Sequence, residues 1–140
     1  MAKKTAIVFG VVLIIAGILG WVPNPLVGSG ALFVTNHAHD VLNLVLGLVL
    51  LIAAFAAAAK SGLWVKIVGV VLLLVGILGL VMTSADGMLL GLFLVNMADS
   101  WMQIVLGIVL LVLGFMGKGS HKMAPPASMP PAGGMPGSTM

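Results

Sequence analysis

Residues 36–55, NHAHDVLNLVLGLVLLIAAF, and residues 96–115, NMADSWMQIVLGIVLLVLGF, are two versions of one pattern. Aligned at an offset of 60, nine of their 20 positions are identical, including Asn36 and Asn96. Each stretch opens with polar residues and continues as an unbroken apolar run. This is typical of a capped helix that enters lipid. The pattern therefore predicts two related transmembrane helices.

The composition of the whole chain supports a membrane location. Of the 140 residues, 61% are hydrophobic and only 6% are charged, with a mean hydropathy of +1.30. A soluble domain carries roughly 25% charged residues, so this chain is expected to be an integral membrane protein. It has no cysteine, which excludes disulfides and thiolate chemistry. Its six basic residues form no basic face outside the apolar segments, and no nucleic-acid partner is expected.

A second internal match extends the repeat. Residues 10–20 (GVVLIIAGILG) and 69–79 (GVVLLLVGILG) agree at eight of 11 positions. We expect two tandem repeats, 1–62 and 63–117, followed by a disordered Pro/Gly/Met-rich cytoplasmic tail at 118–140.

Each repeat contains two apolar segments of a length that spans the bilayer. In lipid the backbone must satisfy its own hydrogen bonds, so these segments should be helical. The predicted fold is an all-α, integral membrane four-helix bundle built from two tandem, parallel two-helix repeats. The predicted helices cover about 5–22, 39–59, 63–82 and 99–117.

The charges predict the orientation. With four spans, every lysine falls on one side of the membrane, and Asp40, Asp86 and Asp99 fall on the other. The positive-inside rule then places both termini in the cytoplasm. On the outer side, the connections 23–35 and 83–95 are long and partly apolar. They are expected either to fold back over the helix ends as interfacial or re-entrant pieces, or to lie on the headgroups.

Small residues recur at intervals of seven along the apolar segments. Such spacing keeps one seam of a helix facing its partner, and small residues let helix backbones approach closely in lipid. The predicted packing positions are Gly10, Gly17, Gly47, Gly69, Gly76, Gly107 and Gly114.

Polar residues gather near the predicted outer surface. Asn36 and Asn96 are predicted helix caps. The alignment places His39 opposite Asp99 and Asn43 opposite Gln103, which predicts an ion pair and a hydrogen bond across the bundle. These contacts either hold helices together, at roughly 0.6–2 kcal/mol each, or mark a functional site. The predicted cluster comprises His37, His39, Asp40, Asn43, Asp99 and Gln103.

No phosphate-binding loop, nucleophile elbow or zinc signature is present, so we expect no enzyme, no metal site and no cofactor. His37 and His39 are two positions apart and would point to different sides of a helix. They cannot chelate one ion together. Ligation of a haem or pigment by His37 or His39 alone is an alternative.

The run SADGMLLGLFLVNMADSWMQIVLGIVLLVLGF resembles the signature of small bacterial four-helix membrane proteins of the domain-of-unknown-function 4383 (DUF4383) family. That resemblance implies a bacterial inner-membrane protein and no known activity. The chain departs from the family at Asn43 and Gln103, where such sequences often carry a histidine. The matching positions are Gly91, Phe93, Asn96, Leu106 and Gly107, and in the first repeat Phe33, Asn36, Leu46 and Gly47.

Three functions are compatible with these patterns. The first is a structural or accessory subunit of a larger membrane assembly, or a homo-oligomer, with lipid and other membrane proteins or itself as partners. The second is a minor transport or ion pathway through the outer polar cluster. No charged or amide side chain lies between Asn43 and Lys60 or between Gln103 and Lys118 to continue such a pathway. The third is the binding of a haem or pigment.

Overall fold

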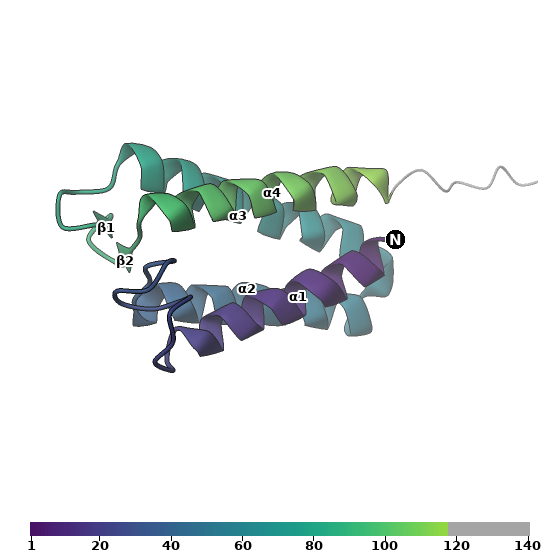
Figure 1. Ribbon diagram of the computed structural model, residues 1–140. Coiled ribbons are helices and arrows are strands. Elements are labelled where there is room, and N and C mark those ends of the chain that lie inside the picture. Colours follow the sequence, from purple (N-terminus) through teal and green to yellow (C-terminus); the bar gives the residue numbers. More distant parts are fainter. Residues whose placement is uncertain (118–140) are drawn as a thin grey trace, which may run out of the picture.

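The computed structural model describes residues 1–117, which form four long helices and one small β-hairpin (Figure 1). All four helices are long and apolar enough to cross a membrane, which confirms the predicted all-α membrane fold. The predicted tail at 118–140 lies outside the described residues. The elements are α1 (Ala2–Leu19), α2 (His37–Ala56), a 3-10 turn (Ala58–Lys60), α3 (Ser61–Val81), β1 (Met88–Leu89), β2 (Phe93–Leu94) and α4 (Met97–Met116).

All four helices begin two or three residues earlier, and end one to three residues earlier, than the sequence predicts. Helix α1 ends at Leu19 because the Asn24 side-chain amide donates to the Leu19 carbonyl oxygen (2.7 Å) and also to the carbonyl oxygen of Val27 (3.0 Å). Pro23 follows at a position from which a helix does not continue. Helices α2 and α4 begin directly after Asn36 and Asn96. The predictions had placed both starts two residues later.

The helices form two hairpins, α1 with α2 and α3 with α4, which lie side by side in Figure 1. Both long connections, 20–36 and 82–96, lie at one end of the bundle, which we call the loop end. The N-terminus and the link 57–60 lie at the opposite end, which we call the terminal end.

Within each hairpin, glycines allow two helix backbones to touch. A Cβ atom added at Gly10 would lie 3.0 Å from the carbonyl oxygen of Gly47, and one added at Gly69 would lie 3.1 Å from that of Gly107. At Gly76 the added atom would lie 2.7 Å from the Ser100 carbonyl oxygen. A side chain fits between backbones this close only if the helices move apart. Six of the seven predicted packing glycines occupy such contacts, namely Gly10, Gly17, Gly47, Gly69, Gly76 and Gly107.

Gly114 differs from the other six. A Cβ atom added there would meet side-chain carbons of Lys66 and Val65 on α3, at 2.6 and 3.3 Å, before it met backbone. Because a flexible lysine side chain can move, this position is expected to accept alanine more readily.

Between the two hairpins the core is apolar. It is built from buried leucine, valine and alanine side chains of all four helices, whereas the outward faces carry exposed apolar residues such as Val8, Val45, Leu74 and Val112. An outward apolar face suits contact with lipid tails. The core residues are Ala6, Leu13, Leu46, Leu50, Ala54, Val65, Val68, Leu72 and Leu110.

The connections at the loop end fold back onto the bundle. This agrees with the first of the two expectations, that they cover the helix ends. Val27, Leu89 and Val95 in these connections are buried, and β1 pairs with β2 in an antiparallel hairpin. At the exposed tip, the Ser84 hydroxyl and the Met88 backbone N–H donate to the carboxylate of Asp86. These bonds lower the pKa of Asp86 below its ordinary value.

Substitution of Gly107 should disrupt the α3–α4 hairpin. An added Cβ atom would lie 2.7 Å from the Leu73 backbone nitrogen, so Gly107→Ala should lower the free energy of unfolding by about 1–3 kcal/mol, as overpacking does. Gly107→Leu or Gly47→Leu should prevent assembly. Thermal unfolding in detergent measures these effects. Val109→Leu on the outward side of α4 is the control, and equal unfolding midpoints for all variants would contradict this packing.

Candidate functional site

Buried polar side chains concentrate at the loop end. Apart from Ser61, which donates to the Ala53 carbonyl oxygen (3.1 Å) near the terminal end, every buried polar side chain in the described residues belongs to this region. They come from three places: the end of the 20–36 connection, the first turns of α2 and the first turns of α4. The members are Thr35, His39, Asp40, Asn43, Asp99, Ser100 and Gln103.

Asn36 and Asn96 cap α2 and α4, as predicted. The side-chain oxygen of Asn36 accepts a hydrogen bond from the His39 backbone N–H (3.1 Å). The oxygen of Asn96 accepts one from the Asp99 backbone N–H (2.9 Å). Each bond satisfies one of the free N–H groups at a helix start. The first turns of both helices, which carry the other polar groups, are fixed in this way.

The same two asparagines also join the two halves of the chain. The Asn36 side-chain amide donates to the Leu92 carbonyl oxygen (2.9 Å), and the Asn96 amide donates to the Leu32 carbonyl oxygen (2.9 Å). Each asparagine therefore caps its own helix and binds the connection of the other hairpin. We call this reciprocal pair of bonds the asparagine latch. The sequence predicted the caps, but not the latch.

His39, Asp99 and Gln103 form a buried group between α2 and α4. The Nε2 atom of His39 lies 3.7 Å from Oδ2 of Asp99, so the proximity that the alignment predicted is present, and the pair is ionic only if the imidazole is protonated. The Gln103 amide nitrogen lies 2.6 Å from the same imidazole nitrogen and donates to Oδ2 of Asp99 (3.0 Å). The Nδ1 atom of His39 lies 3.1 Å from the Leu94 carbonyl oxygen. Both ring nitrogens of His39 are therefore occupied.

The predicted hydrogen bond between Asn43 and Gln103 does not form among residues 1–117. The Gln103 amide nitrogen is directed to His39 and Asp99, and its side-chain oxygen has no partner in the described residues. Asn43 is buried near this group on α2.

Asp40 lies apart from that group, on the side of α2 that faces α1. It is 1% exposed, and neither carboxylate oxygen has a hydrogen-bond partner within the described part of the chain. The carboxylate packs against the Cα atom of Gly20, where any Cβ would overlap with it. Ser100 takes the aligned place in the second hairpin, with its hydroxyl against Gly79. Each hairpin thus places one polar side chain against a glycine of the partner helix.

A small cavity opens beside Asp40 at the loop end. Its volume is about 160 Å³, and it lies between the 20–36 connection and the start of α2. Thr35 has a buried hydroxyl with no hydrogen-bond partner in residues 1–117. The sequence reasoning missed Thr35, although the aligned position holds the apolar Val95, and that difference was a usable signal. The lining residues are Gly20, Ser29, Thr35, Asn36, His37, Asp40 and Leu94.

His37 and His39 point to different surroundings, as their spacing predicted. His37 is exposed and meets the ring of Trp21 edge to face, with ring centroids 6.1 Å apart. His39 is fully buried. Within residues 1–117, no three His, Asp or Glu side chains are close enough to hold one metal ion.

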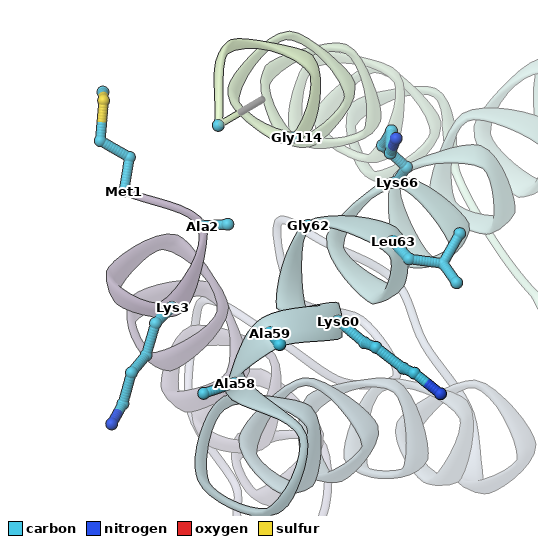
Figure 2. Close-up of a pocket in the computed structure, with 11 residues that line it drawn as sticks. Met1, Ala2, Lys3, Ala58, Ala59, Lys60, Gly62, Leu63, Lys66 and Gly114 are labelled. Carbon is cyan, nitrogen blue, oxygen red and sulfur yellow. The ribbon is translucent and has the colours of Figure 1, made fainter. Parts of the chain in front are cut away.

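A larger cavity, of about 530 Å³, lies between the helix ends at the terminal end. Figure 2 shows that the side chains of Lys3 and Lys60 point away from its middle, which is bordered by Ala2, Gly62 and Gly114. The ammonium group of Lys3 lies 5.6 Å from the centre of the Phe55 ring. The lysines at this end are therefore directed toward the surroundings of the bundle.

Comparison with known proteins places this arrangement in a family. The model of a family described as "Domain of unknown function (DUF4383)" matches residues 3–116. This match confirms the resemblance drawn from the sequence. The comparisons with curated proteins and with solved structures found no match.

The asparagine latch can be separated from the caps by substitution. Asn36→Asp keeps the oxygen that accepts from His39 N–H but replaces the amide that donates to Leu92. Asn36→Ala removes both. We expect Asn36→Ala to lose about 1–3 kcal/mol of unfolding free energy and Asn36→Asp to lose less, but still a measurable amount. Thermal unfolding and hydrogen exchange of residues 82–96 measure the two losses. Full stability of Asn36→Asp would show that the latch contributes nothing.

Replacement of Gln103 should lower the free energy of unfolding, because its amide is shared by two buried side chains. Gln103→Leu leaves Asp99 and His39 buried without their shared amide, which should cost about 1–3 kcal/mol. The triple variant His39→Leu, Asp99→Leu, Gln103→Leu removes the whole polar group. It should lose less than the sum of the three single changes, as equilibrium unfolding in detergent would reveal. If the loss of unfolding free energy in the triple variant equalled the sum of the three single losses, the three side chains would not be coupled.

Proposed function

This chain belongs to the DUF4383 family, whose function is unknown, and we propose that it is a non-catalytic structural subunit that packs against another membrane protein. We further propose that the loop end faces outward and the terminal end faces the cytoplasm of a bacterial cell. Asp40, Asp86 and Asp99 belong to the loop end, whereas Lys3 and Lys60 belong to the terminal end. The positive-inside rule favours this orientation.

The observation that carries the proposal is the apolar middle of the bundle. Between Asn43 and Gln103 on one side and Ser61 on the other, the buried side chains of the described residues are apolar, with Leu50, Leu72 and Leu110 at the centre. An ion that left the polar group at the loop end would meet only hydrocarbon. This closed interior favours a role through association over a role through transport.

The small-residue seams are not available for that association. Gly47 and Gly107, which could have received a partner helix, contact the backbones of α1 and α3 within the same chain. The surface for a partner must lie elsewhere.

An apolar groove on α2 is the best candidate for this surface. It has a volume of about 520 Å³ and is bounded on one side by the connection that carries Phe93. Ala38, Val41, Leu42 and Val45 are spaced i, i+3, i+4 and i+7, so they lie on one face of α2 along two turns. A face of this kind fits one transmembrane helix of a partner. The lining residues are His37, Ala38, Val41, Leu42, Val45, Leu92 and Phe93.

The two alternative functions, an ion pathway and the binding of a haem or pigment, are each supported by a single residue. An ion pathway is favoured by Asp40 alone, whose carboxylate has no partner in the described residues, and is disfavoured by the apolar middle. Ligation of a haem or pigment would fall to His37, because both ring nitrogens of His39 are engaged.

Cross-linking from two aligned positions tests the proposal. Val45 lies in the groove, and Val105 takes the aligned, exposed position on α4. A photoreactive amino acid introduced at Val45 should give a discrete protein adduct in native membranes, detected by its shift on immunoblots and identified by mass spectrometry. The same residue at Val105 should give none. Adducts of equal yield from both positions, or adducts to lipid only, would refute a partner in the groove.

A further inference from the structure

We propose that the cavity beside Asp40 binds one monovalent alkali cation at the loop end. The first observation is the state of the Asp40 side chain. It is 1% exposed, and both of its carboxylate oxygens lack a hydrogen-bond partner within residues 1–117. A buried carboxylate that carries its charge is paired with a charged side chain, hydrogen-bonded or bound to a cation. Within residues 1–117, Asp40 has neither an ion pair nor a hydrogen bond.

No basic side chain in the described residues forms a hydrogen bond or ion pair with Asp40. His39 is the buried base of this region, and its imidazole contacts Asp99, Gln103 and the Leu94 carbonyl oxygen. The loop end thus contains two buried carboxylates and at most one buried positive charge. Lys3 and Lys60 line the cavity at the opposite end of the bundle. A charged Asp40 would therefore take its counter-charge from solution.

The local helix ends favour a negative charge at Asp40 and a cation beside it. The carboxylate belongs to the first turn of α2, where the helix dipole favours a negative charge. The same carboxylate packs against Gly20 at the C-terminal end of α1. The partial negative charge of that helix end favours a positive ion next to it.

The cavity offers the donor atoms and the space that such an ion requires. Thr35 is 2% exposed, and its hydroxyl oxygen has no partner in the described chain. Ser29 and Asn36 also line the cavity. The volume of about 160 Å³ holds an ion with a few water molecules at about 30 Å³ each. Oxygen donors select hard cations over zinc, copper or iron.

Charge balance favours a monovalent ion over a divalent one. Asp40 is the one acidic side chain that lines the cavity, and exposed His37 at its mouth would add positive charge when protonated. One carboxylate and one alkali cation sum to zero. A divalent ion would leave an unbalanced charge beside a buried side chain, which is costly.

The second hairpin indicates that this carboxylate is not needed for packing. Ser100 is a neutral residue in the aligned place, and its hydroxyl lies against Gly79 as the Asp40 carboxylate lies against Gly20. The variant Asp40→Ser therefore copies a packing arrangement that the fold already contains. It removes the charge and should leave the bundle intact.

Binding of radioactive sodium, and of rubidium as a surrogate for potassium, tests the proposal. The full chain is purified in detergent and assayed with choline chloride as the inert salt. The wild type should bind one ion per chain saturably, and its unfolding midpoint should rise in sodium relative to choline. Both effects should be lost in Asp40→Ser and weakened in Thr35→Val. They should persist in Asp86→Asn, which changes an exposed acid at the same end.

Each outcome of these assays decides the proposal. The proposal is overturned if the wild type binds neither sodium nor rubidium saturably. It is also overturned if Asp40→Ser and Thr35→Val bind these ions as the wild type does. Preferential binding of calcium would overturn the assignment of a monovalent ion to the cavity. Circular dichroism and gel filtration establish that the variants are folded. If Asp40→Ser failed to fold, the wild-type and Thr35→Val results would still decide. Neither assay depends on a partner, so the proposed structural role is tested separately.

Discussion

The asparagine latch is the constraint on which the rest of this structure depends. Two side chains, Asn36 and Asn96, each satisfy a helix start and a carbonyl oxygen of the opposite connection. Lipid provides no hydrophobic force between helices, because its tails are as apolar as leucine. Directional polar bonds must therefore fix how the two hairpins meet. The latch does so at the loop end, and the apolar core follows from the alignment it imposes.

The latch also explains where polar side chains are tolerated. His39, Asp99 and Gln103 come directly after the two caps and are held within reach of one another. Deeper in the bundle, a glycine of one helix meets the backbone of its hairpin partner, and leucine fills the space between hairpins. The chain therefore separates two tasks along its length. Hydrogen bonds define the register at one end, and close packing supplies contact area below.

The sequence predicted the parts of this arrangement that depend on periodicity. Alignment at an offset of 60 predicted the contact of His39 with Asp99, and spacing predicted the caps and most packing glycines. It did not predict the latch, because the acceptors are backbone carbonyl oxygens whose positions depend on the path of irregular connections. The expected bond of Asn43 with Gln103 does not form: the Gln103 amide nitrogen turns to His39 and Asp99, and its oxygen has no partner in the described residues.

Positions that differ between the two halves were harder to interpret. Asp40 could be assigned to the helix dipole from its place in the first turn, but its burial against Gly20 follows from the approach of α1. Thr35 could not be identified for the same reason, because its hydroxyl is buried only by the path of the connection in the folded chain. The orientation of glycine seams toward the same chain also required knowledge of which helices pair.

The long sequence separation of the latch has a consequence for biosynthesis. Asn36 finds its acceptor 56 positions further along the chain, and His39 finds its carbonyl partner 55 positions further along. During translation the first hairpin therefore enters the bilayer with an amide and an imidazole that have nothing to bind. These groups must be sheltered by the insertion machinery or by water at the headgroups until the ribosome has delivered the second hairpin. The hydrogen bonds of Asn36 and His39 to the second connection can form only after that connection has been synthesised.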